Sequence, residues 1–442
     1  MFFFYSLLLT LAFILMSPLF LLRRQKYVAG FRQRLGNYPE FKHDDRKVVW
    51  LHCVSVGETN AARPLVDELK TNFPDHRIVV STTTLTGQNL AQDIFKDKAD
   101  AVFYFPFDWK FSVHRALANY KPLIVLLMET EIWPRLIHEA KKSGAKIAIV
   151  NGRLSETSFK RYSIFKSFIR NVLAKVDIAL MQDESDAART TLLGIDPTKV
   201  KVTGNLKFDL DLDSSETDLT NQFRERFGIS SERPLIVAAS THAPEELWVL
   251  EAFAEFFLGP SKLRPRLLIA PRHPERFDEV AEQVRSIGIS RFPQFKQLSL
   301  VRRSSIESDK DKAADVILLD SIGELRAVYQ LAEIVFVGGS LIPHGGQSVL
   351  EPAAAGKAII TGPYTHNFEA VVQELLTNHA IIQLPEVRDE QIVDWLFDAI
   401  SDLFENAEER KFLGSMAATV MAANRGATGK TVEYIKQIAA SY

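Results

Sequence analysis

The chain has 442 residues, 46% of them hydrophobic and 24% charged, a composition typical of globular rather than disordered proteins. This length predicts two domains rather than one core. The net charge is -2, but residues 1–38 carry five Arg or Lys and no acid, so the remainder carries -7, which argues against a broad nucleic-acid surface. Cys53 is the only cysteine, which excludes an intrachain disulfide.

The first 22 residues are apolar and carry no charge, and Arg23, Arg24 and Lys26 follow them. About 20 apolar residues can cross a bilayer as a helix. Positive charge after the run, rather than before it, disfavours a cleaved signal peptide and predicts that the rest of the chain is cytoplasmic. Pro18 leaves two alternatives open, a spanning helix or one lying in the interface with its arginines on anionic headgroups. We expect membrane attachment in either case.

Short apolar runs alternate with segments of helical periodicity between residues 48 and 205. This alternation predicts a parallel sheet with helices on both faces. The expected strands are 48–54, 77–82, 101–105, 123–128, 146–150, 177–181 and 199–203, with helical segments at 61–73, 86–96, 133–143 and 185–193.

A polar, acidic stretch at 209–218 is typical of a linker, and a second α/β series follows it. Two doubly wound domains would leave a cleft, the usual place for a ligand. Strands of the second series are expected at 235–239, 266–270, 316–319, 334–337 and 358–360. We therefore divide the chain into a membrane anchor with its basic segment (1–38), a first domain (39–208), a linker (209–222) and a second domain (223–442) whose last helix can pack back on the first.

Carboxylates follow two apolar strands of the first domain. Glu58 lies after strand 48–54, where a helix begins, so it is either a first-turn glutamate that complements the helix dipole or a catalytic carboxylate. Glu129 and Glu131 follow strand 123–128, and buried carboxylates are costly unless they are used or paired. Lys207, just before the linker, could reach the cleft.

Two strand ends of the second domain have residues suited to an anion. Arg272, after Pro271, offers a guanidinium that can bind two phosphate oxygens, or it is a surface residue of a helix-entry loop. The segment Ser321-Ile322-Gly323-Glu324-Leu325 opens a helix whose N–H groups suit an anion, although Ser321 and Glu324 also fit an ordinary capping box.

The clearest nucleotide pattern is a strand that ends in Gly338-Gly339-Ser340, followed by Gly345-Gly346 before a helix with Glu351. Glycines let the backbone approach a phosphate, and a first-turn carboxylate can accept hydrogen bonds from a ribose diol. The pattern lacks both the dinucleotide glycine turn and the Lys-Ser/Thr phosphate loop. No residue spacing suggests a metal, so we expect neither structural zinc nor a cofactor.

Taken in order, seven motifs closely resemble those of the 3-deoxy-D-manno-octulosonic acid (Kdo) transferases of Gram-negative bacteria. The resemblance implies a two-domain GT-B glycosyltransferase that moves Kdo from CMP-Kdo to the lipid A precursor (lipid IVA) at the cytoplasmic face of the inner membrane. The motifs are Ser55-Val56-Gly57-Glu58, Glu129-Thr130-Glu131-Ile132-Trp133-Pro134, Gly152-Arg153-Leu154-Ser155, Gly204-Asn205-Leu206-Lys207-Phe208-Asp209, Pro271-Arg272-His273-Pro274-Glu275-Arg276-Phe277, Gly323-Glu324-Leu325 and Gly338-Gly339-Ser340-Leu341.

The resemblance also implies roles for single residues. Glu58 matches the general base, and Lys207 with either Glu129 or Glu131 matches groups that stabilise the transition state of an inverting, metal-independent reaction. The CMP-binding segments of the family correspond to Pro271, Arg272, Gly323, Glu324, Leu325, Ser348, Val349, Leu350 and Glu351.

One segment departs from the family pattern, because Gln347-Ser348 stands where members commonly have His-Asn. Both side chains still donate and accept hydrogen bonds, so we expect CMP binding to survive. Two alternatives remain open: a membrane-tethered nucleotide-binding or scaffold protein with a decayed site, and a nucleoside-diphosphate sugar transferase of the same architecture.

Overall fold

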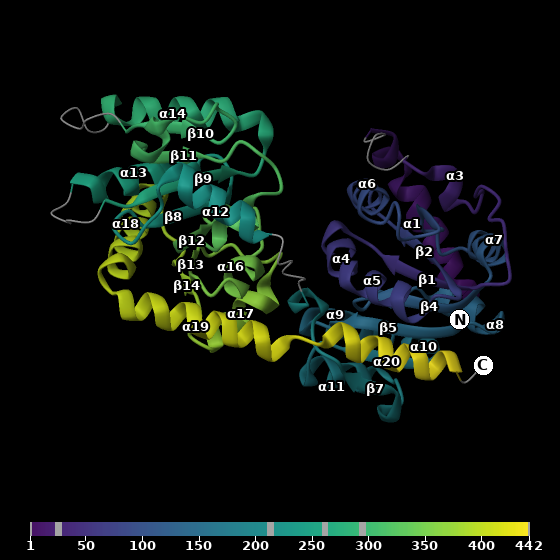
Figure 1. Ribbon diagram of the computed structural model, residues 1–442. Helices are drawn as coiled ribbons and strands as arrows, with labels where there is room; N and C mark the ends of the chain where they lie inside the picture. The colour runs from purple at the N-terminus through teal and green to yellow at the C-terminus, as the bar shows by residue number, and fades with distance from the viewer. Residues whose placement is uncertain (1, 23–28, 210–215, 259–263, 291–297, 441–442) are drawn as a thin grey trace. The chain divides into compact units, whose positions relative to one another are not determined.

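A computed structural model describes the chain except for residues 1, 23–28, 210–215, 259–263, 291–297 and 441–442 (Figure 1). The chain forms two compact units. Unit 1 contains Met1–Asp209 together with Asn424–Tyr442, and unit 2 contains Leu210–Ala423. Unit 2 is therefore inserted between two segments of unit 1.

Unit 1 is built on a parallel sheet of seven described strands in the order β3-β2-β1-β4-β5-β6-β7. The strands are β1 (Lys47–Cys53), β2 (His76–Thr82), β3 (Ala101–Tyr104), β4 (Pro122–Met128), β5 (Lys146–Gly152), β6 (Ile178–Met181) and β7 (Val200–Val202). The helices are α1 (Phe2–Leu22), α3 (Phe31–Arg34), α4 (Val56–Ala61), α5 (Arg63–Asn72), α6 (Leu85–Ile94), α7 (Lys110–Tyr120), α8 (Pro134–Lys142), α9 (Glu156–Ile164), α10 (Lys166–Leu173), α11 (Glu184–Leu193) and α20 (Ala427–Ala440), with short 3-10 helices η1 (Pro197–Lys199) and η2 (Leu206–Phe208).

Both faces of this sheet are buried, as expected for a doubly wound fold. On one face, Leu51 of β1 packs in a cluster with Leu65 of α5 and Ile435 of α20. On the other face, Trp50 packs in a second cluster with Val113 of α7 and Leu136 of α8. Successive residues of β1 thus serve opposite cores because strand side chains alternate between faces.

Unit 2 repeats the architecture, with seven described parallel strands in the order β10-β11-β9-β8-β12-β13-β14. The strands are β8 (Leu235–Thr241), β9 (Arg266–Pro271), β10 (Leu300–Arg302), β11 (Val316–Leu318), β12 (Ala332–Val337), β13 (Ala358–Thr361) and β14 (Ile382–Gln383). The helices are α12 (Glu216–Phe227), α13 (Glu245–Leu258), α14 (Phe277–Ser290), α15 (Leu325–Tyr329), α16 (Leu350–Ala354), α17 (Glu369–Thr377), α18 (Asp389–Glu405) and α19 (Ala407–Asn424), with η3 (Pro274–Arg276) and η4 (Asp309–Ala313).

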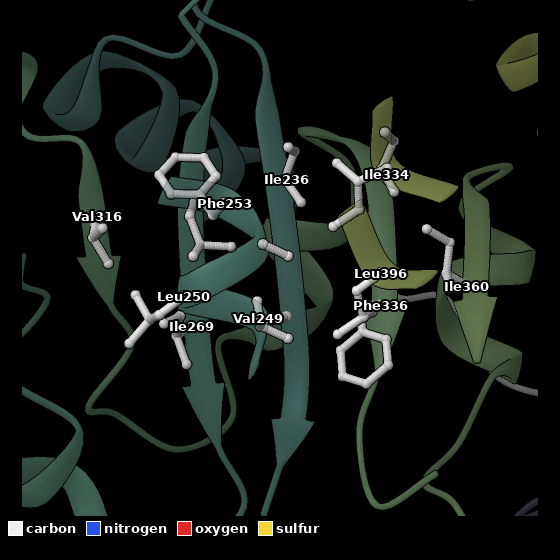
Figure 2. Close-up of a cluster of buried hydrophobic side chains, with 14 of the residues drawn as sticks. Ile236, Val249, Leu250, Phe253, Ile269, Val316, Ile334, Phe336, Ile360 and Leu396 are labelled. Carbon is white, nitrogen blue, oxygen red and sulfur yellow. The ribbon is translucent and has the colours of Figure 1, made fainter. Parts of the chain in front are cut away.

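Helices α13 and α18 cover one face of the second sheet. Figure 2 shows Leu250 of α13 beside Ile269 of β9, and Leu396 of α18 near Phe336 of β12. These side chains are almost completely buried and belong to one apolar cluster. The cluster holds the strands in register, so the loops at their carboxyl ends start from a rigid support.

The structure confirms the expected two-sheet α/β class and differs from the sequence expectations in detail. Edge strands β10 and β14 were not expected, and they are only three and two residues long. Residues 216–222 of the expected linker form the first part of α12, and residues 210–215 lie outside the described residues.

The apolar N-terminal helix α1 packs on unit 1. The hydroxyl of Tyr5 donates a hydrogen bond of 2.8 Å to buried Asp108, and the guanidinium of Arg135 donates to the hydroxyl of Ser6 at 3.1 Å. The outer side of α1 exposes large apolar residues, namely Phe3, Phe4, Leu7, Leu8, Leu11, Ile14, Leu15 and Met16. Within the described residues, no helix combines the length and apolarity required to cross a membrane.

Five basic residues follow α1 within residues 23–38, and of those that the structure describes Arg32 is exposed and Arg34 is buried. Arg23, Arg24 and Lys26 lie outside the described residues. Arg34, the last residue of α3, is buried and donates hydrogen bonds to the backbone carbonyls of Ala29 and Thr83. Arg34 therefore holds loops of unit 1 together instead of facing a lipid headgroup.

Candidate active site

Glu58 lies in the first turn of α4, directly after β1. Ser55 caps this helix, and its hydroxyl accepts a hydrogen bond of 3.5 Å from the backbone N–H of Glu58. In return the Glu58 carboxylate accepts from the backbone N–H of Val54 at 2.7 Å and from the Ser55 hydroxyl at 3.3 Å. The glutamate thus has the geometry of a helix cap, and its side chain is fixed in one orientation.

The electrostatic environment of Glu58 distinguishes it from an ordinary cap. Its side chain is buried, whereas first-turn glutamates are usually solvated. Burial raises the pKa of Glu58 to about 8, and the nearby carboxylates of Glu129 and Glu131 add to the rise. A carboxyl group with a pKa close to neutral pH is suited to accept a proton from an alcohol and to release it again.

Glu129 and Glu131 follow β4 at the same edge of the sheet. Glu129 has a backbone φ of +52°, which a residue with a side chain adopts at an energetic cost. Its carboxylate lies 3.9 Å from the ammonium of Lys207 in η2. Burial raises the pKa of Glu131, and the charge of Glu129 raises it further. The structure therefore gathers all four predicted catalytic side chains in unit 1, near the carboxyl ends of β1, β4 and β7.

Asn151 near the end of β5 belongs to the cluster Asn151-Gly152-Arg153-Leu154-Ser155, which the sequence marks as a candidate functional segment without indicating a role for the asparagine. It is fully buried, has a φ of +52°, and its side-chain carbonyl accepts a hydrogen bond of 2.9 Å from the backbone N–H of Leu206. Leu206 immediately precedes Lys207. The contact thus fixes the start of η2 and, through it, the position of Lys207.

In unit 2 a buried glutamate organises the glycine-rich loop after β12. Glu245, at the start of α13, is fully buried. Its carboxylate accepts hydrogen bonds from the backbone N–H groups of Gly339 (2.6 Å), Ser340 (3.0 Å), Leu341 (2.9 Å) and His242 (2.9 Å). The four donors offset part of the cost of burying this carboxylate, although burial still raises the pKa of Glu245.

This contact changes how the loop can interact with a nucleotide. The sequence suggested that the backbone of Gly338, Gly339 and Ser340 cradles a phosphate. The N–H groups of Gly339 and Ser340 are instead directed at Glu245, and the Ser340 hydroxyl contacts the carbonyl of Val337 and the N–H of Gly362. These N–H groups are therefore not available to an anion.

The remaining predicted binding residues lie around the carboxyl ends of the second sheet. Glu324 accepts two hydrogen bonds, of 2.8 and 3.1 Å, from the guanidinium of Arg303 and another from the hydroxyl of Ser321. Glu351, in the first turn of α16, lies 3.5 Å from the guanidinium of Arg326. Both carboxylates thus have basic partners that would hold them in place for a sugar hydroxyl.

Other members of the predicted set are placed as follows. Pro271 ends β9 and is buried, and Arg272 next to it is exposed. The backbone N–H of Arg272 donates to the carbonyl of Thr241 at 2.9 Å, which ties the ends of β9 and β8 together. Gly323 and Leu325 flank Glu324 at the start of α15, and Ser348, Val349 and Leu350 lead into α16.

Among the described residues no group of three or more His, Cys, Asp or Glu is arranged to hold a metal.

Comparison with known proteins assigns the family. The model of the 3-deoxy-D-manno-octulosonic-acid transferase (kdotransferase) family matches residues 29–210. The 3-deoxy-D-manno-octulosonic acid transferase of Haemophilus influenzae is 32% identical over 413 residues, 93% of this chain and 92% of that protein. The chain belongs to the Kdo transferase family.

One solved structure agrees with the architecture of this Kdo transferase family member, and another is similar to its second half in sequence. A glycosyltransferase from Rickettsia africae, 14% identical, has a TM-score of 0.54 over 89% of this chain and 99% of that one, which supports the GT-B fold. The C-terminal CMP-Kdo binding domain of WaaA from Acinetobacter baumannii is 31% identical over 47% of this chain and 99% of that domain, with a TM-score of 0.40.

Proposed function

We propose that this chain transfers Kdo from CMP-Kdo to a sugar hydroxyl of the lipid A precursor, lipid IVA, in lipopolysaccharide biosynthesis. The observation that carries the proposal is the buried Glu58 carboxyl, whose pKa is raised to about 8 at a strand end of unit 1 in a member of the Kdo transferase family. The strand-end residues of unit 2, Arg272 and Glu351 among them, support a nucleotide donor.

In the proposed reaction Glu58 takes the proton from the acceptor hydroxyl as its oxygen attacks the anomeric carbon of Kdo. Attack on the face opposite the departing CMP inverts the configuration, through a transition state with oxocarbenium character. The bond to CMP breaks as the new glycosidic bond forms, and its electron pair leaves with the phosphate. The cationic side chain of Arg272 would stabilise the negative charge that grows on the phosphate. In unit 1, Lys207 with one of Glu129 and Glu131 would help to stabilise the transition state.

We further propose that α1 attaches the enzyme to the cytoplasmic face of the inner membrane, where its lipid acceptor lies. Leu8 and Leu15 of α1 have 63% and 79% of their surface exposed, which is unfavourable in water and favourable in the acyl region of a bilayer. A groove of about 770 Å³ beside α1 includes the basic residue Lys110, whose ammonium suits an anionic headgroup.

The decisive experiment is incubation of the full chain with CMP-Kdo and lipid IVA, followed by mass spectrometry of the lipid. We expect a mass increase of one or more Kdo units with the wild type and almost none with Glu58→Gln. Glu68→Gln on the exposed side of α5 is the matched control and should react normally. Transfer from a nucleoside-diphosphate sugar instead of CMP-Kdo would replace the proposal, and CMP binding without any transfer would support the scaffold alternative.

A further inference from the structure

His242 is a buried basic residue at the carboxyl end of the second sheet, next to the last residue of β8. Only 7% of its surface is exposed. Within the described part of the chain, neither ring nitrogen of His242 has a hydrogen-bond partner of good geometry. The backbone of Ser240 raises the pKa of the ring, but by less than burial and the two neighbouring histidines lower it. The hydroxyl of the adjacent Thr241 is also buried without a partner among the described residues. Unpartnered polar atoms of this kind are uncommon in a core and call for a partner such as water, an ion or a ligand.

Other basic side chains surround His242. The ring centroid of His344, from the loop after β12, lies 4.2 Å from that of His242, and the ring of His273, from the loop after β9, lies 5.2 Å away. The guanidinium of Arg272 is a further neighbour. We call His242, Arg272, His273 and His344 the basic cluster. His273 and His344 are exposed, so a molecule from solvent can reach it.

Acidic groups near the basic cluster do not neutralise it. The carboxylate of Glu275 lies 3.8 Å from the ring of His273, but its side chain is 76% exposed. The carboxylate of Glu245 accepts the backbone N–H of His242 and is saturated by the loop after β12. The unused hydrogen-bonding capacity therefore belongs to cationic or protonatable side chains from three loops, a composition that favours an oxyanion.

We propose that the basic cluster binds the phosphate of the nucleotide donor and that His242 takes up a proton when the phosphate binds. The inference rests on the proposed function and deepens it, because it assigns the phosphate to side chains rather than to the glycine loop. When the phosphate binds, one proton moves from solvent to a ring nitrogen of His242, and no bond of the ligand is broken. The protonated ring then donates a hydrogen bond to a phosphate oxygen.

The charge environment supports this proton uptake. Burial, followed by the positive charges of His344, His273 and Arg272, lowers the pKa of His242 to about 4, so the ring is neutral in the free protein near neutral pH. A phosphate placed among these groups reverses their effect, because an adjacent negative charge favours the protonated ring. If bound phosphate raises the pKa of His242 to about 7, the ring of the complex is protonated at pH 6 and largely neutral at pH 8, whereas the ring of the free protein is neutral at both. Binding is then roughly tenfold tighter at pH 6 than at pH 8.

Calorimetric titration with the methyl phosphodiester of CMP tests the proposal. This probe carries one charge, as CMP-Kdo does at its phosphate, and does not itself change protonation between pH 6 and 8. Titration at pH 6 in two buffers of different ionisation enthalpy measures proton uptake. We expect close to one proton per ligand for the wild type, and about tenfold weaker binding at pH 8. Cytidine, which lacks the phosphate, should bind without proton uptake.

The matched variants are His242→Asn and, as control, His379→Asn at an exposed position of unit 2 with a φ of +51° that asparagine tolerates. His242→Asn should lose the proton uptake and most of the pH dependence, whereas His379→Asn should keep both. The backbone bond from residue 242 to Glu245 is unaffected by the exchange, and His242→Gln with a melting curve provides a second check on folding.

Wild-type binding without proton uptake, or unchanged uptake in a folded His242→Asn or His242→Gln variant, would overturn the assignment. The mass-spectrometric transfer assay separates this result from failure of the proposed function. Transfer of Kdo without proton-linked binding refutes only the role of His242. Proton-linked binding without transfer leaves the anion site in place and refutes the proposed reaction.

Discussion

The carboxylate of Glu245 accepts a hydrogen bond of 2.6 Å from the backbone N–H of Gly339, 94 residues further along the chain. Three more backbone N–H groups share this carboxylate, so both of its oxygens are acceptors for the loops at the end of the second sheet. The contact joins the start of α13 to the loop after β12.

Replacing Glu245 by glutamine should destabilise unit 2. Glutamine presents an NH₂ group to two backbone donors, which leaves them unsatisfied, at a cost of about 1–3 kcal/mol for each buried group. Urea unfolding measures the effect. Glu282→Gln on the exposed side of α14 is the control, and equal unfolding free energies for the two variants would show that Glu245 is not needed to hold the loop.

Glu58→Gln should lower the turnover number for Kdo transfer by about 10³-fold, within the range observed when an acid–base group is removed. Because the base must be unprotonated, wild-type kcat/KM for the lipid acceptor, measured with CMP-Kdo at saturation, should rise with pH through the Glu58 pKa of about 8. Rates measured between pH 6 and 9 test both points. A flat profile in this window, or turnover within tenfold of the wild type, would remove Glu58 from the base role.

Glu129→Gln should shift the rising limb of this pH profile to lower pH. The negative charge of Glu129 contributes to the raised pKa of Glu58, second only to burial, so its removal makes Glu58 easier to ionise. Some loss of turnover is also expected, since the ammonium of Lys207 loses its carboxylate neighbour. Comparison with Glu68→Gln isolates the local effect, and a midpoint that stays in place or moves upward would contradict the prediction.

The carboxyl group of Glu58 should also make the free energy of unfolding depend on pH. The pKa of Glu58 is raised from 4.5 to about 8, so between these values the folded state binds more protons than the unfolded state, and stability falls as pH rises. Glu58→Gln removes this dependence because glutamine does not titrate. Melting curves should show Glu58→Gln gaining stability relative to the wild type from pH 5 to pH 8.5. A constant difference between the two proteins would mean that the pKa of Glu58 is not raised by folding.

Charges on the outer side of α1 should weaken membrane binding. Burial of one leucine contributes about 1.5–3 kcal/mol, so Leu8→Glu with Leu15→Glu should lower partition into anionic phospholipid vesicles by more than about tenfold. Leu192→Glu is the control, because Leu192 of α11 is also a largely exposed leucine, at 59%. Vesicle flotation that is the same for both variants would refute attachment through α1.

The strand framework could be read from the sequence because the buried strands are continuous apolar runs. Strand β4, for example, is buried along its whole length and lies within one residue of the expected range. The edge strands β10 and β14 gave no such signal, since runs of two or three residues have no usable periodicity. Glu58 could be found because a carboxylate directly after a buried strand is a local pattern.

The positions and contacts of Glu245 and His242 were harder to predict from the sequence. The segment Thr241-His242-Ala243-Pro244-Glu245 follows a strand, as the other selected motifs do, but nothing local shows that its glutamate reaches a loop 94 residues away. The glycine pattern after β12 favoured a phosphate cradle for the same reason: a sequence shows that backbone N–H groups are available but not which distant acceptor occupies them. A buried acid at the start of a helix, opposite a glycine-rich loop, is the signal to look for.

Helix α20 has a consequence for the order in which the chain can fold. Ala427, Val432 and Ile435 complete one core of unit 1, although more than 200 residues of unit 2 separate them from β7. During synthesis, unit 2 can bury its own core before these residues leave the ribosome, whereas the domain that contains Glu58 must wait for the end of the chain. The core beneath Glu58, the proposed general base, is therefore completed last, and loss of α20 would destabilise unit 1 rather than unit 2, which precedes α20 in the chain.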